Sequence, residues 1–538
     1  MKINKKYLEI FAITILYLSA LYIWTLPIHN NRLPFGDVDA SSHFAIGDYM
    51  SMHGSSIAKI PEYVGIRYGG QNEMFPWALW YPPQYWTNAG IMQLIGGDRI
   101  LSFFIMIAIF CSLFILSSYF LIRSLFGFWP AFLSSLLLIF SVRDYMVYLF
   151  GQWPQSLGYA FTPLILYCYY KYADSILNKE KKTVYIYIMS LLLVIQSLMH
   201  PQGFIASAGT MVIFTGLLLI REKKLPFNFK HLFIILAIFF VVSILLAPLN
   251  MGEFFGEIFK TGGERESWNL GILFSWYQDS SKFQGLPAFY FYYNTSHGDI
   301  NGSKLGYWTL PLLFIGVIVV FLNGFILKKD RKNILLFSWL IAFYLLTHLA
   351  AFGMGGRDQR MMAFEAHVIY PIIAIGLLSI PSFFKLNNFV NKIAKYSLII
   401  IFIVFALAVN GKSTIGMLNM QQYSISRINP YQYEVSEWVL KNLPEDAYIY
   451  DIGTFGYQYY GAKVKWLSVL SQRPFVLENR MVNMSDYIML DYSDLALLRK
   501  EEEVNNLRKF ESENFGDATP VYNKELIKVY EVGNFKAE

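Results

Sequence analysis

Long apolar segments constrain this chain most. About eleven of them are separated by polar links, and only 15% of the 538 residues are charged, whereas soluble domains carry roughly 25%. A helix of about 20 apolar residues spans the hydrocarbon core of a bilayer. The sequence therefore predicts a polytopic α-helical membrane protein with about eleven transmembrane helices. The segments lie near 7–27, 99–122, 128–142, 156–173, 184–200, 203–220, 231–249, 307–327, 333–352, 362–381 and 394–411.

The links between the segments indicate how the chain is oriented. With eleven crossings, all the short lysine-rich links fall on one side, and the positive-inside rule places that side in the cytoplasm. We therefore expect a plasma-membrane protein with a cytoplasmic N-terminus and an extracytoplasmic C-terminus. The basic links are "MKINKK" at the N-terminus, "NKEKK" (178–182), "REKK" (221–224), "KKDRKN" (328–333) and "FFKLNNFVNKIAK" (383–395).

Charge separates a tail from this membrane part. From Arg427 onward there are 13 Lys and Arg against 18 Asp and Glu, although the whole chain has a net charge of +6. We expect a membrane domain over 1–411, with large external loops at 28–98 and 250–306, and a small extracytoplasmic α/β domain over 412–538. Membrane topology accounts for the basic excess, so no nucleic-acid partner is implied.

The first external loop begins with unusual polar chemistry. Asp37 and Asp39 form a D-x-D pair, and His43 follows four residues later. In an extended chain the two aspartates project to the same side. We expect a helix from about Ser41, which leaves two interpretations: Asp39 is an N-cap, or the carboxylates bind a metal or accept a proton from a hydroxyl.

The same loop continues with an aromatic stretch, "NEMFPWALWYPPQYWTNAG". Trp80, Tyr81 and Trp86 are its candidate substrate-binding residues, because aromatic planes beside a few carboxylates suit sugar rings and prenyl chains. The alternative is an aromatic belt at the membrane interface.

A third polar stretch, "GGRDQRMMAFEAHVIYP", opens the tenth apolar segment. Arg357 and Arg360 stand at its external end, where an arginine pair suits a phosphate. Glu365 and His367 lie inside the apolar run, and ionisable residues at that depth are functional candidates by default, so we count both among the candidate substrate-binding residues. The alternative is that the arginines reach lipid headgroups or pair with Asp358.

These features occur in a characteristic order. "GDVDASSH", "YPPQYW", "GRDQRMMAF" and "EVSEWVLKNLPEDAYIYDIGT" follow one another along the chain. In this order and architecture the sequence resembles the GT-C superfamily of integral-membrane glycosyltransferases. That resemblance implies a polyprenyl-phosphate-linked sugar as donor, membrane lipids as surroundings, and a glycan, lipid or protein acceptor on the extracytoplasmic side.

The resemblance also implies a mechanism. Arg357 or Arg360 holds the phosphate that leaves, and Asp37 or Asp39 accepts the acceptor proton or holds a divalent cation such as Mg²⁺ or Mn²⁺. His43 orients Asp39 or contacts the acceptor. Attack opposite the phosphate inverts the anomeric centre, as in an inverting hexosyl- or pentosyltransferase.

One difference from known members of this superfamily narrows the type of sugar transfer that we expect. Oligosaccharyltransferases of this superfamily carry a W-W-D-Y-G motif, which the tail of this chain lacks. The sequence thus favours transfer of single sugars over asparagine-linked transfer of a whole glycan. The alternative function is a lipid-linked sugar flippase or transporter, which should carry ionisable residues at mid-membrane in several helices.

Overall fold

The computed structural model forms two compact units, each described here by itself. The bundle unit comprises Met1–Trp24, Ala108–Val147 and Trp153–Leu418, and the α/β unit comprises Thr25–Ile107, Tyr148–Gln152 and Asn419–Glu538. The structure describes residues 5–29, 32–36, 38–54, 63, 84–180, 182–246, 270, 273, 307–352, 364–384, 387–421, 428–453, 460–476, 482 and 484–534.

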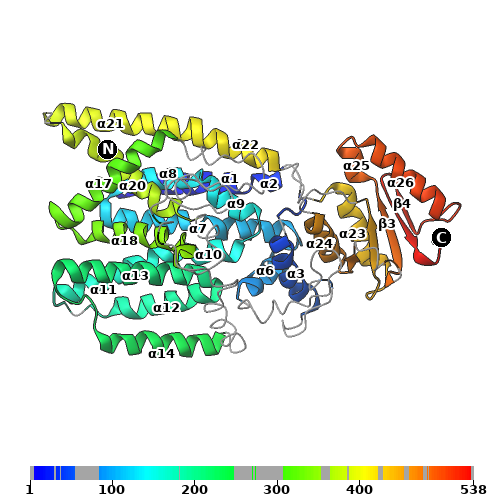
Figure 1. Cartoon of the computed structure of the whole chain (residues 1–538), viewed down its shortest axis with the longest axis horizontal. Helices are drawn as coiled ribbons and strands as arrows, with labels where there is room; N and C mark the ends of the chain where they lie inside the picture. The colour runs from blue at the N-terminus through cyan, green and yellow to red at the C-terminus, as the bar shows by residue number, and fades with distance from the viewer. Residues whose placement is uncertain are drawn as a thin grey trace. The chain divides into compact units, whose positions relative to one another are not determined.

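The bundle unit is helical (Figure 1). Each of the apolar segments seen in the sequence contains a helix, because within a bilayer a helix satisfies its own backbone hydrogen bonds. The helices are α1 (Lys5–Trp24), α7 (Leu101–Phe126, which enters this unit at Ala108), α8 (Phe128–Ile139), α9 (Val142–Leu149), α10 (Trp153–Ala160), α11 (Thr162–Leu177), α12 (Val184–Met199), α13 (Pro201–Glu222), α14 (Phe229–Leu246), α17 (Leu310–Phe321), α18 (Arg331–Leu346), α20 (Ala366–Ser379), α21 (Asn388–Phe405) and α22 (Lys412–Gln421). Short 3-10 turns are η4 (Tyr307–Thr309), η6 (Leu349–Phe352) and η7 (Ile380–Phe383), and π-helical turns are η5 (Leu322–Ile326) and η8 (Ala406–Gly411).

The chain is a multi-pass membrane protein. In the described part, 6 helices are long and apolar enough to cross a bilayer, or up to 7 if α8 and α9, which meet at a 43° bend, form one broken span. Helix α12 and the α17–η5 helix are apolar but shorter. The full set of eleven crossings and their direction stay predictions.

Burial distinguishes central from peripheral helices. In the span formed by α20 and η7, 72% of the 18 apolar-rich residues are buried inside the protein. In the corresponding 18 residues of α14 the buried share is 11%. Figure 1 shows α14 and α21 at opposite edges of the bundle, and both expose large apolar side chains such as Phe233 and Ile400. Apolar side chains exposed on a peripheral helix are stable against lipid tails rather than water, so these helices form the outer surface in the membrane.

Two glycines allow α17 and α20 to pack closely. A Cβ added to Gly316 would lie 2.1 Å from the carbonyl oxygen of Ile372, and one added to Gly376 would lie 2.2 Å from that of Leu312. Both obstacles are backbone atoms, which cannot move aside as a side chain does. Small residues at such contacts let membrane helices approach and gain van der Waals contact.

Replacing Gly316 with leucine should therefore separate α17 from α20 and lower the unfolding temperature of the detergent-purified protein. Gly216→Leu is the matched control, because nothing lies within 4 Å of a Cβ at that helical position. Equal unfolding temperatures for both variants would show that the close approach does not stabilise the bundle.

Three of the basic links lie at one end of the bundle. Arg331, from "KKDRKN", donates hydrogen bonds to Asp174 at 2.6 Å, to Asn178 at 2.9 Å and to Glu222 at 3.0 Å. Asn178 begins "NKEKK", and Glu222 belongs to "REKK". This common end agrees with the expected pattern of basic loops, while the compartment that it faces stays a prediction.

The α/β unit contains a five-stranded mixed sheet of order β2-β1-β3-β5-β4. Strand β1 pairs in parallel with β2 and β3, β3 pairs antiparallel with β5, and β5 forms an antiparallel hairpin with β4. The elements are α2 (Leu26–His29), α3 (Val38–His53), α6 (Gln84–Gly96), α23 (Pro430–Asn442), β1 (Ile449–Ile452), α24 (Tyr460–Ser471), β2 (Phe475–Val476), β3 (Tyr487–Asp491), α25 (Ser493–Leu497), α26 (Glu501–Asn514), β4 (Tyr522–Lys524), β5 (Ile527–Glu531) and the 3-10 turn η10 (Val532–Asn534).

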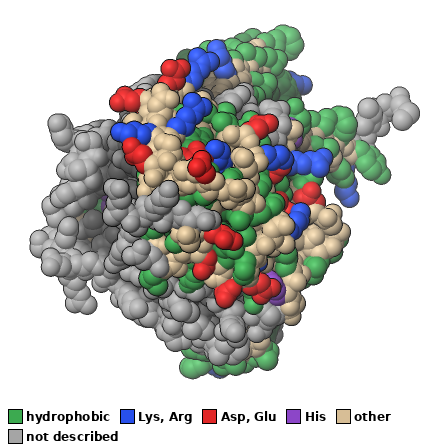
Figure 2. Space-filling view, turned by 90° about the vertical axis from the view of Figure 1, so that its right-hand side faces the viewer, with side chains coloured by type: hydrophobic (Ala, Val, Ile, Leu, Met, Phe, Trp, Pro, Cys, Tyr) green, Lys and Arg blue, Asp and Glu red, His purple; other side chains and the backbone are tan. Residues whose placement is uncertain are grey.

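Helices cover both faces of this sheet, because side chains alternate between its faces. On one face α23 and α24 pack on Ile449 and Met489. On the other face α25 and α26 pack on Ile488 and Leu490 (Figure 1). Figure 2, which looks at the right-hand side of Figure 1, shows acidic and basic side chains interspersed over the outer surface, an arrangement typical of a face in water.

Part of the first predicted loop belongs to this same unit. Helix α3 lies against α24, where the Trp466 indole donates a hydrogen bond to the Gly36 carbonyl at 2.9 Å and packs on Phe44 with ring centroids 5.5 Å apart. Segments more than 400 residues apart in sequence thus share a hydrophobic core. The predicted domain boundary near residue 412 stays a prediction.

Candidate functional site

Helix α3 carries the described part of the first-loop motif. It begins at Val38, three residues before the expected start at Ser41, so Asp39 lies in its first turn rather than at the N-cap. A carboxylate in a first turn interacts favourably with the helix dipole, which explains the earlier start. Asp39 is partly buried, and His43, one turn further along, is buried with 3% of its surface exposed.

Several other predicted site residues cannot be placed. Asp37, Trp80, Tyr81, Arg357 and Arg360 lie outside the described residues. Trp86 belongs to α6, but its side chain also lies outside the described part. Their roles in binding or catalysis stay predictions.

The second carboxylate of α3 is fully engaged in structural hydrogen bonds. Asp48, which is completely buried, accepts two hydrogen bonds from the Arg99 guanidinium, Nε to Oδ1 at 2.7 Å and Nη2 to Oδ2 at 2.6 Å. Gln93 and Gln472 donate to the same carboxylate at 3.3 and 3.4 Å. Both oxygens are thus occupied, and Asp48 is a structural anchor rather than a free base.

Arg99 joins the first loop to α24. Its guanidinium donates to the carbonyl oxygens of Leu470 at 2.8 Å and Val469 at 3.2 Å. Burial by itself lowers the pKa of Arg99, but the charge and hydrogen bonds of Asp48 outweigh it, and the pKa lies above the usual arginine value. The arginine therefore stays charged, as a buried ion pair of this kind requires.

A second charged cluster lies inside the bundle unit, where α9 meets the start of α20. Arg143 pairs with Glu365, and Nε2 of His367 lies 2.7 Å from Oδ1 of Asp144. All four residues are buried, with at most 3% of their surface exposed. Ser141 donates to the second oxygen of Asp144. The two predicted substrate residues, Glu365 and His367, are thus both engaged with α9, and their contact with substrate stays a prediction.

Arg143 and Asp144 were not among the predicted site residues. In the sequence, both residues follow directly on the apolar segment near 128–142. That end of the segment is expected on the same side of the membrane as the start of the tenth segment. Pairing between positions 222 residues apart does not follow from this signal in the sequence, because neither periodicity nor spacing relates the two helices.

A metal site is not formed by the described side chains. Among them, no three His, Cys, Asp or Glu residues are grouped so as to hold a metal ion. Asp39 by itself supplies one carboxylate, whereas Mg²⁺ needs a near-octahedral shell of oxygen ligands. Cation binding by Asp37 and Asp39 stays a prediction.

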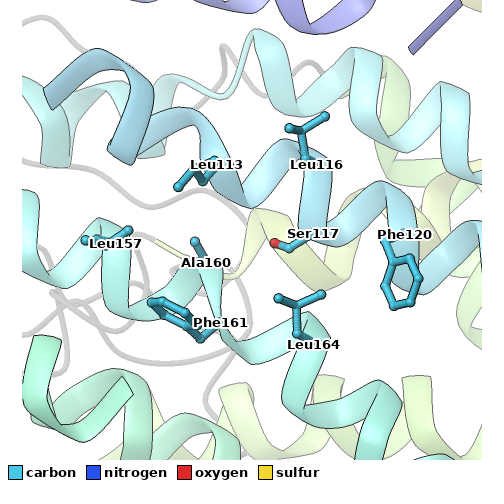
Figure 3. Close-up of a pocket in the computed structure, with 8 residues that line it drawn as sticks. All are labelled: Leu113, Leu116, Ser117, Phe120, Leu157, Ala160, Phe161 and Leu164. Atoms are coloured by element: carbon cyan, nitrogen blue, oxygen red, sulfur yellow. The ribbon is translucent and has the colours of Figure 1, made fainter. Parts of the chain in front are cut away.

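An apolar cavity of 260 Å³ lies between α7, α10 and α11 (Figure 3). Ser117 is the one polar side chain in its lining, so the cavity lacks the hydrogen-bonding groups that a sugar or phosphate needs. Figure 3 shows α7 side chains facing those of α10 and α11. The lining residues are Leu113, Leu116, Ser117, Phe120, Leu157, Ala160, Phe161 and Leu164.

Comparison with solved structures identifies the fold. ArnT from Cupriavidus metallidurans, solved bound to undecaprenyl phosphate, is 10% identical with a TM-score of 0.56, and the match covers 98% of this chain and 99% of that one. The oligosaccharyltransferase of Archaeoglobus fulgidus is 13% identical with a TM-score of 0.56, over 89% of this chain and 69% of that one. The mycobacterial arabinofuranosyltransferase AftD is 12% identical with a TM-score of 0.51, over 91% of this chain but 35% of that one.

These similarities extend over most of the chain, so it has the fold of GT-C glycosyltransferases, as the sequence predicted. At this level of identity they show the fold alone. No curated protein sequence matches the chain. The model of one family, described as "Family of unknown function (DUF6541)", matches residues 71–378, more than half of the chain, and the chain therefore belongs to that family.

Proposed function

We propose that this chain is a membrane glycosyltransferase that moves a sugar from a polyprenyl-phosphate-linked donor to a glycan, lipid or protein acceptor on the extracytoplasmic side. The observation that carries the proposal is the likeness to ArnT, solved with undecaprenyl phosphate, along almost the whole of both chains. The buried charged side chains where α9 meets the start of α20 are compatible with it, since such groups are costly at membrane depth without a task.

The reaction is a single displacement. An acceptor oxygen attacks the anomeric carbon, the bond from that carbon to the phosphate oxygen breaks, and the configuration inverts. Asp39 takes the acceptor proton as general base, and His43 orients it from one turn along α3. Arg357 or Arg360 binds the phosphate and stabilises the charge that it gains on leaving. No step needs a metal ion, although one on Asp37 and Asp39 would add positive charge at the phosphate.

Mass spectrometry of surface glycans from cells lacking the gene tests this function. We expect one class of sugar residue to be lost and its polyprenyl-phosphate-linked form to accumulate, because the donor is no longer consumed. Re-expression of the wild-type chain should reverse both changes. Unchanged glycans together with unchanged lipid-linked sugars would contradict the proposal.

A further inference from the structure

The charged cluster between α9 and the start of α20 has a complementary pattern. Arg143 and Asp144 are adjacent on α9 and present a positive and then a negative charge. Glu365 and His367 present a negative charge and a basic ring in return. Each member of one pair meets its opposite, although 222 residues separate the Arg143 and Glu365 positions.

Stability by itself is a poor explanation for this cluster. Buried ion pairs lose hydration, and their replacement by apolar side chains of similar volume is often neutral or stabilising. What a buried charge pattern does provide is a single register, since sliding α20 along α9 would bring Glu365 toward Asp144 and leave Arg143 without its carboxylate partner. Because an unpaired buried charge is strongly destabilising, these shifted registers of α20 are excluded.

Aromatic rings fix the same residues from two other helices. His367 stacks on Phe114 of α7, with ring centroids 4.4 Å apart and planes at 13°. Phe364 stacks on Tyr159 of α10, with centroids 3.9 Å apart and planes at 9°. The start of α20 and the two residues before it are therefore held by α7, α9 and α10 at once.

This anchored position lies next to the proposed phosphate-binding residues in sequence. Arg360 precedes Glu365 by five residues, and Arg357 precedes it by eight. We propose that the Arg143–Glu365 and Asp144–His367 pairs are positioning residues for donor binding, which fix the register of α20 against α9 directly after the proposed phosphate-binding stretch in sequence. The inference rests on the proposed function; here Glu365 and His367 act through the arginines rather than by touching the donor.

The test is a double variant that keeps the packing but removes the charge pattern, Arg143→Met with Glu365→Leu. We expect an unfolding temperature equal to or above that of the wild type, because the buried pair is replaced by apolar volume. Activity should nevertheless fall: misplacing a binding group by about 1 Å can cost about 10²-fold. We expect a loss of that order in kcat/KM for the polyprenyl-phosphate donor, with a raised KM.

The matched control is Arg123→Met with Glu9→Leu, which removes another Arg–Glu pair of the bundle unit, between α7 and α1. It should leave kcat/KM unchanged. Wild-type kcat/KM in the Arg143/Glu365 variant would overturn the positioning role, whereas an inactive wild-type protein would contradict the proposed function instead.

If that double variant does not fold, Arg143→Lys decides the question. Lysine keeps the charge but not the forked geometry of the guanidinium. A lower kcat/KM at an unchanged unfolding temperature supports the positioning role, and an unchanged kcat/KM overturns it.

Discussion

Replacing Asp39 with asparagine is expected to lower the rate of sugar transfer by about 10²–10⁴-fold, the usual contribution of a general base. The change removes the proton acceptor while keeping the size of the side chain. Because asparagine is also tolerated near a helix N-terminus, α3 should form as before. The rate is measured with purified protein and a saturating lipid-linked donor.

Asp98→Asn is the matched control for this variant. Asp98 caps α7 by accepting hydrogen bonds from the backbone N–H groups of Ile100 at 2.9 Å and Leu101 at 2.6 Å. An asparagine oxygen can accept the same bonds, so this variant should keep the wild-type rate. If Asp39→Asn also kept that rate, Asp39 would have no part in the chemistry, and Asp37 would become the leading candidate for the base.

Replacing Arg99 with methionine is expected to destabilise the α/β unit by about 3–5 kcal/mol, the cost of leaving a buried partner charge uncompensated. The fully buried Asp48 carboxylate would lose its guanidinium partner, with only Gln93 and Gln472 left to donate hydrogen bonds to it. Helix α3 would also lose the guanidinium that links it to the α24 carbonyls. The free energy of unfolding is measured by urea titration of the purified protein.

Lys509→Met provides the comparison, since it breaks the exposed Lys509–Glu513 pair of α26. Surface pairs contribute about 0–1 kcal/mol, so little change is expected. A double variant, Arg99→Met with Asp48→Leu, should recover most of the stability lost in Arg99→Met, because neither charge of the buried pair remains. Equal unfolding free energies for Arg99→Met and Lys509→Met would show that the buried pair does not anchor the unit.

The elements of the fold follow from local patterns in the sequence. Apolar segments predict the bundle helices because length and hydropathy suffice to identify a span. In the tail, "PYQYEVSEWVLKN" predicts a helix, and α23 covers these residues behind an Asn429–Gln432 capping box. Likewise, "VYNKELIKVYEV" (521–532) predicts a terminal hairpin around "NKE", and β4 and β5 form that hairpin. Each of these predictions depends on neighbouring residues only.

The contacts between distant segments could not be predicted in this way. The sequence marks Asp48 as one more carboxylate of the first loop, yet the structure uses it to bind Arg99 and Gln472. Glu365 and His367 are conspicuous because they are ionisable within an apolar run, but nothing local names Arg143 and Asp144 as their partners. Tertiary packing decides which charges meet, and one sequence carries no record of that choice.

The proposed reaction transfers a sugar from a lipid phosphate to an acceptor. The most direct test is to reconstitute the wild-type protein in liposomes with a polyprenyl-phosphate-linked sugar pool and a glycan acceptor extract. Mass spectrometry then follows the lipids. We expect free polyprenyl phosphate to appear in step with glycosylated acceptor, because breaking the anomeric bond yields both. A lipid-linked sugar that crosses the bilayer intact, with no free polyprenyl phosphate released, would contradict the account and indicate a transporter.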